Sequence, residues 1–99
     1  MKSPVIYTFA NFYNPEDGKS YDLRLGKRKG RKIGGLKFQI YKEKGVFISN
    51  PSNRTVIIDS GIEKISVGSE WTSLIDESTI YLSGKTLLVT IHTRKKRRK

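Results

Sequence analysis

The stretch that decides the fold class is residues 45–65, GVFISNPSNRTVIIDSGIEKI. Its two apolar runs, Val46-Phe47-Ile48 and Thr55-Val56-Ile57-Ile58, are rich in the β-branched and aromatic residues that favour strands. Between the runs, Asn50-Pro51-Ser52-Asn53 predicts a turn, because Pro51 has no N–H and Asn and Ser side chains bond to nearby backbone. We therefore expect two adjacent antiparallel strands hinged at residues 50–53.

The same pattern of short strands and turns continues on both sides of this stretch. Strands are predicted at residues 5–13, 20–25, 36–41, 71–74, 79–82 and 86–91, with turns rich in Gly, Pro, Asp and Ser between them. No segment of about ten or more residues has a helical period. The pattern is typical of an antiparallel sandwich or barrel, and we predict an all-β fold, an antiparallel β-sandwich of short strands.

Length and composition limit the choices further. Ninety-nine residues suffice for one domain with a two-layer core, and the absence of cysteine excludes disulfides and thiolate metal sites. No apolar run approaches the roughly 20 residues that a membrane-spanning helix needs. Residues 1–7 lack a long apolar core of the signal-peptide type, so we expect cytoplasmic residence. The predicted domain covers residues 1–93, and a basic tail follows at residues 94–99.

The net charge of +11 is concentrated in two segments. Residues 19–44 carry ten basic and two acidic residues, whereas residues 45–93 carry three basic and five acidic ones. Residues 94–99 are all basic, and we predict that this tail is disordered when free. Charge of this kind attracts polyanions and says little about the fold.

Residues 26–35, GKRKGRKIGG, predict a mobile basic loop or a tight basic hairpin. Its cations could grip an anion while its glycines let backbone N–H groups approach a phosphate; the alternative is a solvated hairpin tip. Together with Arg24 and the tail, it supplies the candidate anion- or nucleic-acid-binding residues. These are Arg24, Lys27, Arg28, Lys29, Arg31, Lys32, Arg94, Lys95, Lys96, Arg97, Arg98 and Lys99.

Aromatic residues are not interleaved with the cations in either basic segment, so the sequence signals no base-stacking platform there. Nucleic acid would then be held through its phosphates, with weak sequence preference. Five other aromatic residues could offer a stacking face if their strand were exposed, but we expect them in the core. They are Tyr7, Phe9, Phe12, Tyr13 and Tyr41.

From Gly45 onward, the chain resembles the second half of a forkhead-associated (FHA) domain. Ser52-Asn53-Arg54-Thr55 resembles the Ser-x-Asn-Gly-Thr turn of that family, and Glu63-Lys64-Ile65 resembles its Lys-Ile position. Residues 74–84, LIDESTIYLSG, resemble the signature L-x-D-G-D-x-I-x-L-G, and residues 86–91 resemble the closing strand. The resemblance covers about half of the chain. It implies an FHA/SMAD-like β-sandwich that docks a partner protein through loops at one end.

The other half departs from the family pattern. Ile33-Gly34-Gly35 resembles the early Gly-Arg of the phosphopeptide site, but Gly35 stands where Arg is expected. No Ser-x-x-His follows before Gly45, and Arg54 replaces the Gly of the Asn-Gly-Thr turn. The resemblance therefore implies a fold more than a ligand, and an acidic or a phosphorylated partner both stay open.

The turn nevertheless supplies the candidate partner-binding residues, which are Ser52, Asn53, Arg54 and Thr55. The alternative is that Asn and Ser side chains merely cap the backbone of their own hairpin.

Catalytic chemistry is not indicated. His92 is the only histidine, has no acid and hydroxyl arrangement beside it in the sequence, and cannot form a metal site alone. Asp76 and Glu77 are neighbours in a predicted turn, which favours turn formation over an acid/base pair. We expect no enzyme, cofactor or metal. The preferred hypothesis is a non-enzymatic FHA-like module for protein–protein interaction; the alternative is a small basic β-protein that binds DNA or RNA through residues 26–32 and the tail.

Overall fold

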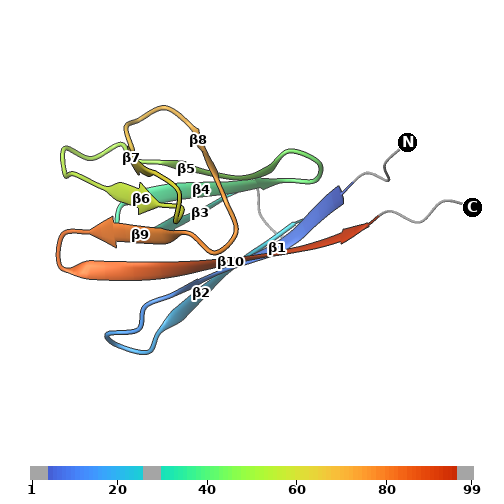
Figure 1. The fold of residues 1–99 in the computed structure, drawn as a ribbon, viewed down its shortest axis with the longest axis horizontal. Coiled ribbons are helices and arrows are strands. Elements are labelled where there is room, and N and C mark those ends of the chain that lie inside the picture. The colour runs from blue at the N-terminus through green and yellow to red at the C-terminus, as the bar shows by residue number, and fades with distance from the viewer. Residues whose placement is uncertain (1–4, 26–29, 96–99) are drawn as a thin grey trace, which may run out of the picture.

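Two antiparallel sheets lie face to face, and the first and last described residues, Val5 and Lys95, pair with each other at one end of the molecule (Figure 1). This computed structural model describes residues 5–25 and 30–95, which form ten strands and no helix. The predicted all-β fold class is therefore confirmed. Its layers are those of a sandwich, because one buried cluster contains residues from both sheets.

The larger sheet has six strands in the order β2-β1-β10-β9-β6-β7. Their bounds are β1 Val5–Tyr13, β2 Ser20–Arg24, β6 Ile57–Asp59, β7 Lys64–Ser66, β9 Thr79–Leu82 and β10 Lys85–Lys95. The smaller sheet has four strands in the order β3-β4-β5-β8. Their bounds are β3 Gly30–Ile33, β4 Leu36–Tyr41, β5 Gly45–Ser49 and β8 Thr72–Leu74.

The core forms where the apolar faces of the two sheets meet. Leu36, Phe38 and Ile40 on β4 are buried, and the residues that alternate with them point outward. Phe38 meets Phe12 of β1, with ring centroids 4.3 Å apart, and both side chains are fully buried. Each sheet therefore keeps one face dry and leaves the other for solvent.

Strand β10 is longer than the sequence predicts. It pairs with β1 from Leu88 opposite Tyr13 to Lys95 opposite Val5, with a bulge between Tyr7 and Phe9. The predicted strand ended at residue 91 and the predicted domain at residue 93. Arg94 and Lys95, which we assigned to the disordered tail, instead belong to this strand because β1 supplies backbone partners for them. Residues 96–99 lie outside the described residues.

The predicted hairpin at residues 50–53 is wrong. Strand β5 pairs with β4 and β8 in the smaller sheet, whereas β6 pairs with β7 and β9 in the larger one. The segment between them crosses from one sheet to the other. Both strands still bury apolar side chains, Ile48 in the smaller sheet and Ile58 in the larger one. The prediction of two strands is therefore confirmed, whereas the prediction that they pair with each other is wrong.

The basic segment is partly a strand. Gly30 to Ile33 form β3, which pairs with β4 through a two-residue turn at Gly34-Gly35. Both turn glycines have positive φ, 57° and 84°, as a type I′ hairpin turn requires. Lys27, Arg28 and Lys29 lie outside the described residues. Arg31 and Lys32 are thus held on a strand rather than on a loop.

Because Phe38 is completely buried against Phe12, Phe38→Ala is expected to leave a cavity that costs about 3–5 kcal/mol of unfolding free energy. Urea denaturation followed by circular dichroism measures this loss. Tyr13→Ala, which truncates a half-exposed aromatic side chain, is the matched control and should cost much less. Equal losses in the two variants would contradict the assignment of the core.

Candidate functional site

The segment that crosses between the sheets, residues 50–54, is called the arch here, and Asn50 holds it in shape. The Asn50 side chain is only 4% exposed. Its Nδ2 donates to the carbonyl oxygens of Arg54 and Val67, at 2.8 and 3.1 Å. Its Oδ1 accepts from the backbone N–H and the hydroxyl of Ser52, at 3.1 and 2.7 Å. One buried amide therefore satisfies the backbone on both sides of the crossing.

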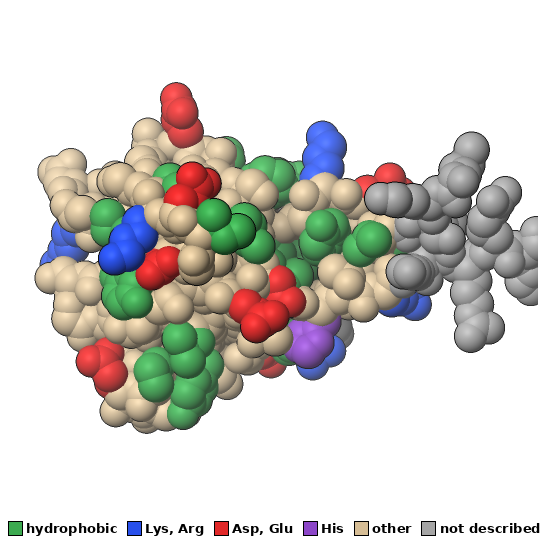
Figure 2. Space-filling model, viewed as in Figure 1, with side chains coloured by type: hydrophobic (Ala, Val, Ile, Leu, Met, Phe, Trp, Pro, Cys, Tyr) green, Lys and Arg blue, Asp and Glu red, His purple; other side chains and the backbone are tan. Residues whose placement is uncertain are grey.

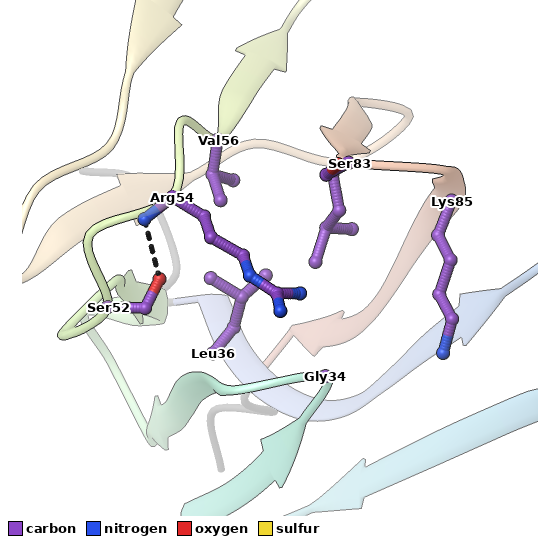
Figure 3. Close-up of a pocket in the computed structure, with 8 residues that line it drawn as sticks. Gly34, Leu36, Ser52, Arg54, Val56, Ser83 and Lys85 are labelled. Atoms are coloured by element: carbon purple, nitrogen blue, oxygen red, sulfur yellow. Dashed lines mark hydrogen bonds between the residues drawn. The ribbon is translucent and has the colours of Figure 1, made fainter.

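A cavity of about 160 Å³ lies between the arch, the β3–β4 turn and the β9–β10 turn (Figure 3). This arch cavity could hold a few waters, since one water occupies roughly 30 Å³ of the liquid. Its floor includes the buried side chains of Leu36 and Val56, and its rim is polar. The lining residues are Gly34, Leu36, Ser52, Arg54, Val56, Leu82, Ser83 and Lys85.

Two cations face the arch cavity from opposite sides. In Figure 3 the Arg54 side chain reaches across the opening above Leu36, and the Lys85 side chain extends on the other side toward Gly34. Among the described residues, those that line the cavity include no Asp or Glu. Positive charge therefore gathers over an apolar floor, where the interaction with an anion is stronger than in bulk water.

The hydrogen bonds of Ser52 exclude its hydroxyl as a donor to an anion in the arch cavity. Its hydroxyl donates to Oδ1 of Asn50 and accepts from the backbone N–H of Arg54, at 2.7 and 3.2 Å. The hydroxyl proton of Ser52 is thus already engaged in a hydrogen bond within the arch. The guanidinium of Arg54, the ammonium of Lys85 and the hydroxyl of Ser83 are the side-chain donors left to meet a bound anion.

The arch cavity adjoins a more open groove. Arg54, Leu82 and Ser83 line both hollows, and Thr55, Ile57 and Tyr81 complete the groove. The groove runs beside β6 and β9, where Ile57 lies opposite Tyr81. An extended segment could therefore lie on the groove and place a single side chain in the arch cavity.

The four predicted partner-binding residues are divided by the structure. Ser52 and Arg54 line the arch cavity, and Thr55 lines the groove. Asn53 is exposed and lines neither hollow. The capping role considered for this turn also exists, but Asn50 and Ser52 perform it and Asn53 is not among the partners of these bonds.

Sequence reasoning missed Ser83 and Lys85, as well as the part that Gly34 plays in this cavity. Ser83-Gly84-Lys85 predicts only a hairpin turn, which it is, because β9 and β10 pair directly across it. Nothing in the local pattern links this turn to Arg54. The register of the larger sheet brings them together, since β9 separates β10 from β6, the strand that follows the arch.

Of the predicted anion-binding cations whose side chains the structure describes, Arg24 and Arg31 make separate contacts. The guanidinium of Arg24 lies over the ring of Phe9, 4.8 Å from its centroid, and that ring lies 5.1 Å from the ring of His92. Nη1 of Arg31 donates to the carbonyl oxygen of Asp22 at 3.2 Å. Arg31 thereby ties β3 to β2, the edge strands of the two sheets. On the face in Figure 2, Lys and Arg side chains are scattered among acidic and apolar ones.

No protein-family model, curated protein or solved structure matches this chain. Within residues 5–25 and 30–95, no helix has the length and apolar character to cross a membrane. In the same ranges, no three His, Cys, Asp or Glu side chains gather as a metal-ligand set. The candidate site therefore has to be judged on its own geometry.

Because the Asn50 side chain makes four hydrogen bonds, three within the arch and one to Val67, Asn50→Ala is expected to lower the unfolding free energy by about 1–3 kcal/mol, the cost of leaving buried polar groups unsatisfied. Asn53→Ala removes the same side chain from an exposed position three residues away and is expected to change stability by less than about 0.5 kcal/mol. Thermal or urea unfolding of both variants compares them. A larger loss for Asn53→Ala would show that the arch is held differently.

Proposed function

We propose that this chain is a non-enzymatic binding module of FHA-like fold that docks a partner protein. The partner supplies an extended segment, and one phosphorylated or acidic side chain of that segment enters the arch cavity. The observation that carries this proposal is the meeting of Arg54 and Lys85 at one cavity whose described lining has no carboxylate.

The chemistry of the two cations suits an anionic oxygen group. The planar guanidinium of Arg54 can donate two parallel N–H bonds to a phosphate or a carboxylate, which adds orientation to attraction. Lys85 acts as a second point charge on the opposite side. Hydrogen bonds to charged groups contribute about 1.5–3 kcal/mol each, so either cation alone is worth a measurable share of the affinity.

The lining of the groove favours a protein segment as the ligand, rather than a free small anion. Its lining mixes the aromatic ring of Tyr81 and the apolar side chains of Ile57 and Leu82 with Arg54 and Thr55. Apolar and aromatic contacts around one fixed charge are typical of peptide recognition, in which the charge anchors one residue and the flanking contacts select its neighbours.

The resemblance to FHA domains supports a ligand site at the same end of the molecule. In that family, the phosphopeptide site uses an early Gly-Arg and the later Ser-x-Asn-Gly-Thr turn. Here Gly34, from the first of these positions, lines the arch cavity together with Ser52 and Arg54 from the second. Gly35 lacks the family's Arg, and in our proposal Arg54 and Lys85 carry the positive charge instead.

The test uses peptide arrays in which degenerate sequences are identical except at one central position, which is phosphothreonine, glutamate or threonine. We expect retention on the phosphothreonine or the glutamate array, and none on the threonine array. The array that retains the protein identifies whether the anion is a phosphate or a carboxylate. Equal retention on all three would contradict the proposal.

For a peptide selected in this way, Arg54→Ala is expected to weaken binding by about 10- to 100-fold, the equivalent of one charge-assisted hydrogen-bonding group. Lys85→Ala should weaken binding in the same direction, and Arg54→Lys should recover part of the loss because it keeps the charge. Lys64→Ala on β7, an exposed cation outside both hollows, is the control. Fluorescence anisotropy of the labelled peptide measures all four. Unchanged affinity in both Arg54→Ala and Lys85→Ala would overturn the site.

A further inference from the structure

A second cationic surface lies on the outer side of the smaller sheet. Because Leu36, Phe38 and Ile40 of β4 face the core, Lys37, Gln39 and Tyr41 face outward. The register places Lys32 of β3 opposite Lys37, and Phe47 of β5 opposite Gln39. We call this group the aromatic–lysine face: Lys32, Lys37, Gln39, Tyr41 and Phe47.

The aromatic pair on this face is held in place and is reachable from solvent. Tyr41 is 45% exposed, so the prediction that it lies in the core is wrong. Its ring lies edge-on to the ring of Phe47, with centroids 5.5 Å apart. Its hydroxyl donates to Oε1 of Gln39, two residues back on the same face. The contact with Phe47 limits the orientations of the ring before any ligand arrives, which lowers the entropic cost of binding to it.

The charge on this face is positive and uncompensated along its strands. Lys32 and Lys37 lie directly opposite each other on neighbouring strands, an arrangement of like charges that costs stability unless an anion lies between them. The outward positions of β3, β4 and β5 carry no carboxylate in the described part of the chain. Beyond Tyr41, the β4–β5 turn adds Lys42 and Lys44 around Glu43.

Exposed rings and a pair of lysines on one sheet face match the two repeating features of an unpaired nucleic acid strand, which are a base with a π-face and a phosphate. Base stacking on an aromatic side chain contributes about 1–3 kcal/mol per base and tolerates any base. In a duplex the bases stack on one another and their faces are not available. The aromatic ring of Phe9 on the other sheet does not offer such a platform, because Arg24 lies over it.

We propose that the aromatic–lysine face binds single-stranded nucleic acid. Unpaired bases stack on Tyr41 and Phe47, and the phosphates that join them lie against Lys32 and Lys37. Gln39 is the one outward side chain of the face with an amide, so the face has few groups that could read base edges, and we expect weak sequence preference. This surface is separate from the arch cavity, because none of its five residues lines that cavity or the groove.

The test titrates the full chain into a fluorescein-labelled oligothymidylate of roughly 12 nucleotides, within the usual site sizes of single-strand-binding surfaces, and follows anisotropy at several salt concentrations. Tyr41→Ala is expected to weaken binding by about fivefold or more without changing the salt dependence, because it removes stacking and no charge. Tyr13→Ala, which truncates a tyrosine of similar exposure (40%) on the larger sheet, should leave the affinity unchanged.

The charge contribution is separated with a second set of variants. The double variant Lys32→Gln and Lys37→Gln is expected to weaken binding and to lower the salt slope by about 1 to 2, roughly one unit for each phosphate that no longer meets a cation. Lys64→Gln is the control on the larger sheet. Phe47→Leu keeps apolar volume at a half-buried position and removes only the ring, so it provides a second stacking variant that preserves the fold.

Four results would overturn the proposal. The first is equal affinity of Tyr41→Ala and Tyr13→Ala. The second is equally tight binding of a duplex of the same length. The third is equally tight binding of a polyglutamate peptide, which would indicate an acidic protein ligand. The fourth is loss of binding on removal of residues 96–99 while all face variants bind as the parent does, which would assign the binding to the tail.

Discussion

Phe12 and Phe38 meet between the two sheets because neither sheet can leave its apolar face in water. That burial sets the direction of every neighbouring side chain, since successive residues on a strand point to opposite faces. Once Phe38 is inside, Lys37 and Gln39 must be outside. The same constraint that forms the core therefore also arranges the charged and aromatic side chains on the outer surfaces.

The arch is a consequence of joining two sheets with one chain. After β5 the chain leaves the smaller sheet, and β6 belongs to the larger one, so residues 50–54 must cross with their backbone groups satisfied by something other than a strand partner. Asn50 meets part of that need, because its amide bonds the N–H of Ser52 and the carbonyl oxygen of Arg54. Its neighbours Ser52 and Arg54 are consequently held at the end of the sandwich, in a fixed position over an apolar floor, where a binding loop needs to be.

The two proposed surfaces use positive charge in different ways. The arch cavity has Arg54 and Lys85 at one hollow, which suits a single phosphate or carboxylate. The aromatic–lysine face has Lys32 and Lys37 at one end of a sheet surface and Tyr41 with Phe47 further along it, which suits a chain of phosphates and bases. Taken together, our two proposals describe a small basic module with a partner protein at one end and a nucleic acid strand on one sheet.

Strand positions followed from local pattern. The predicted ranges 5–13, 36–41 and 79–82 coincide with β1, β4 and β9, because alternation and turn residues are properties of neighbouring positions. The pairing of the strands could not be predicted from local pattern. Whether the chain forms a hairpin or crosses to the other sheet at residue 50 depends on which distant strands pair with the two edges of β5.

The proposed binding surfaces depend on the same long-range strand pairing. Arg54 was recognisable as a cation in a turn, but its meeting with Lys85 needs the whole order of the larger sheet. Tyr41 was recognisable as an aromatic residue on a strand, but its exposure beside Phe47 needs the core to lie on the opposite side of β4. The sequence alone determined which types of side chain the strands and turns carry. Their grouping into surfaces was set only by the tertiary structure, because strand pairing and burial depend on residues far apart in the chain.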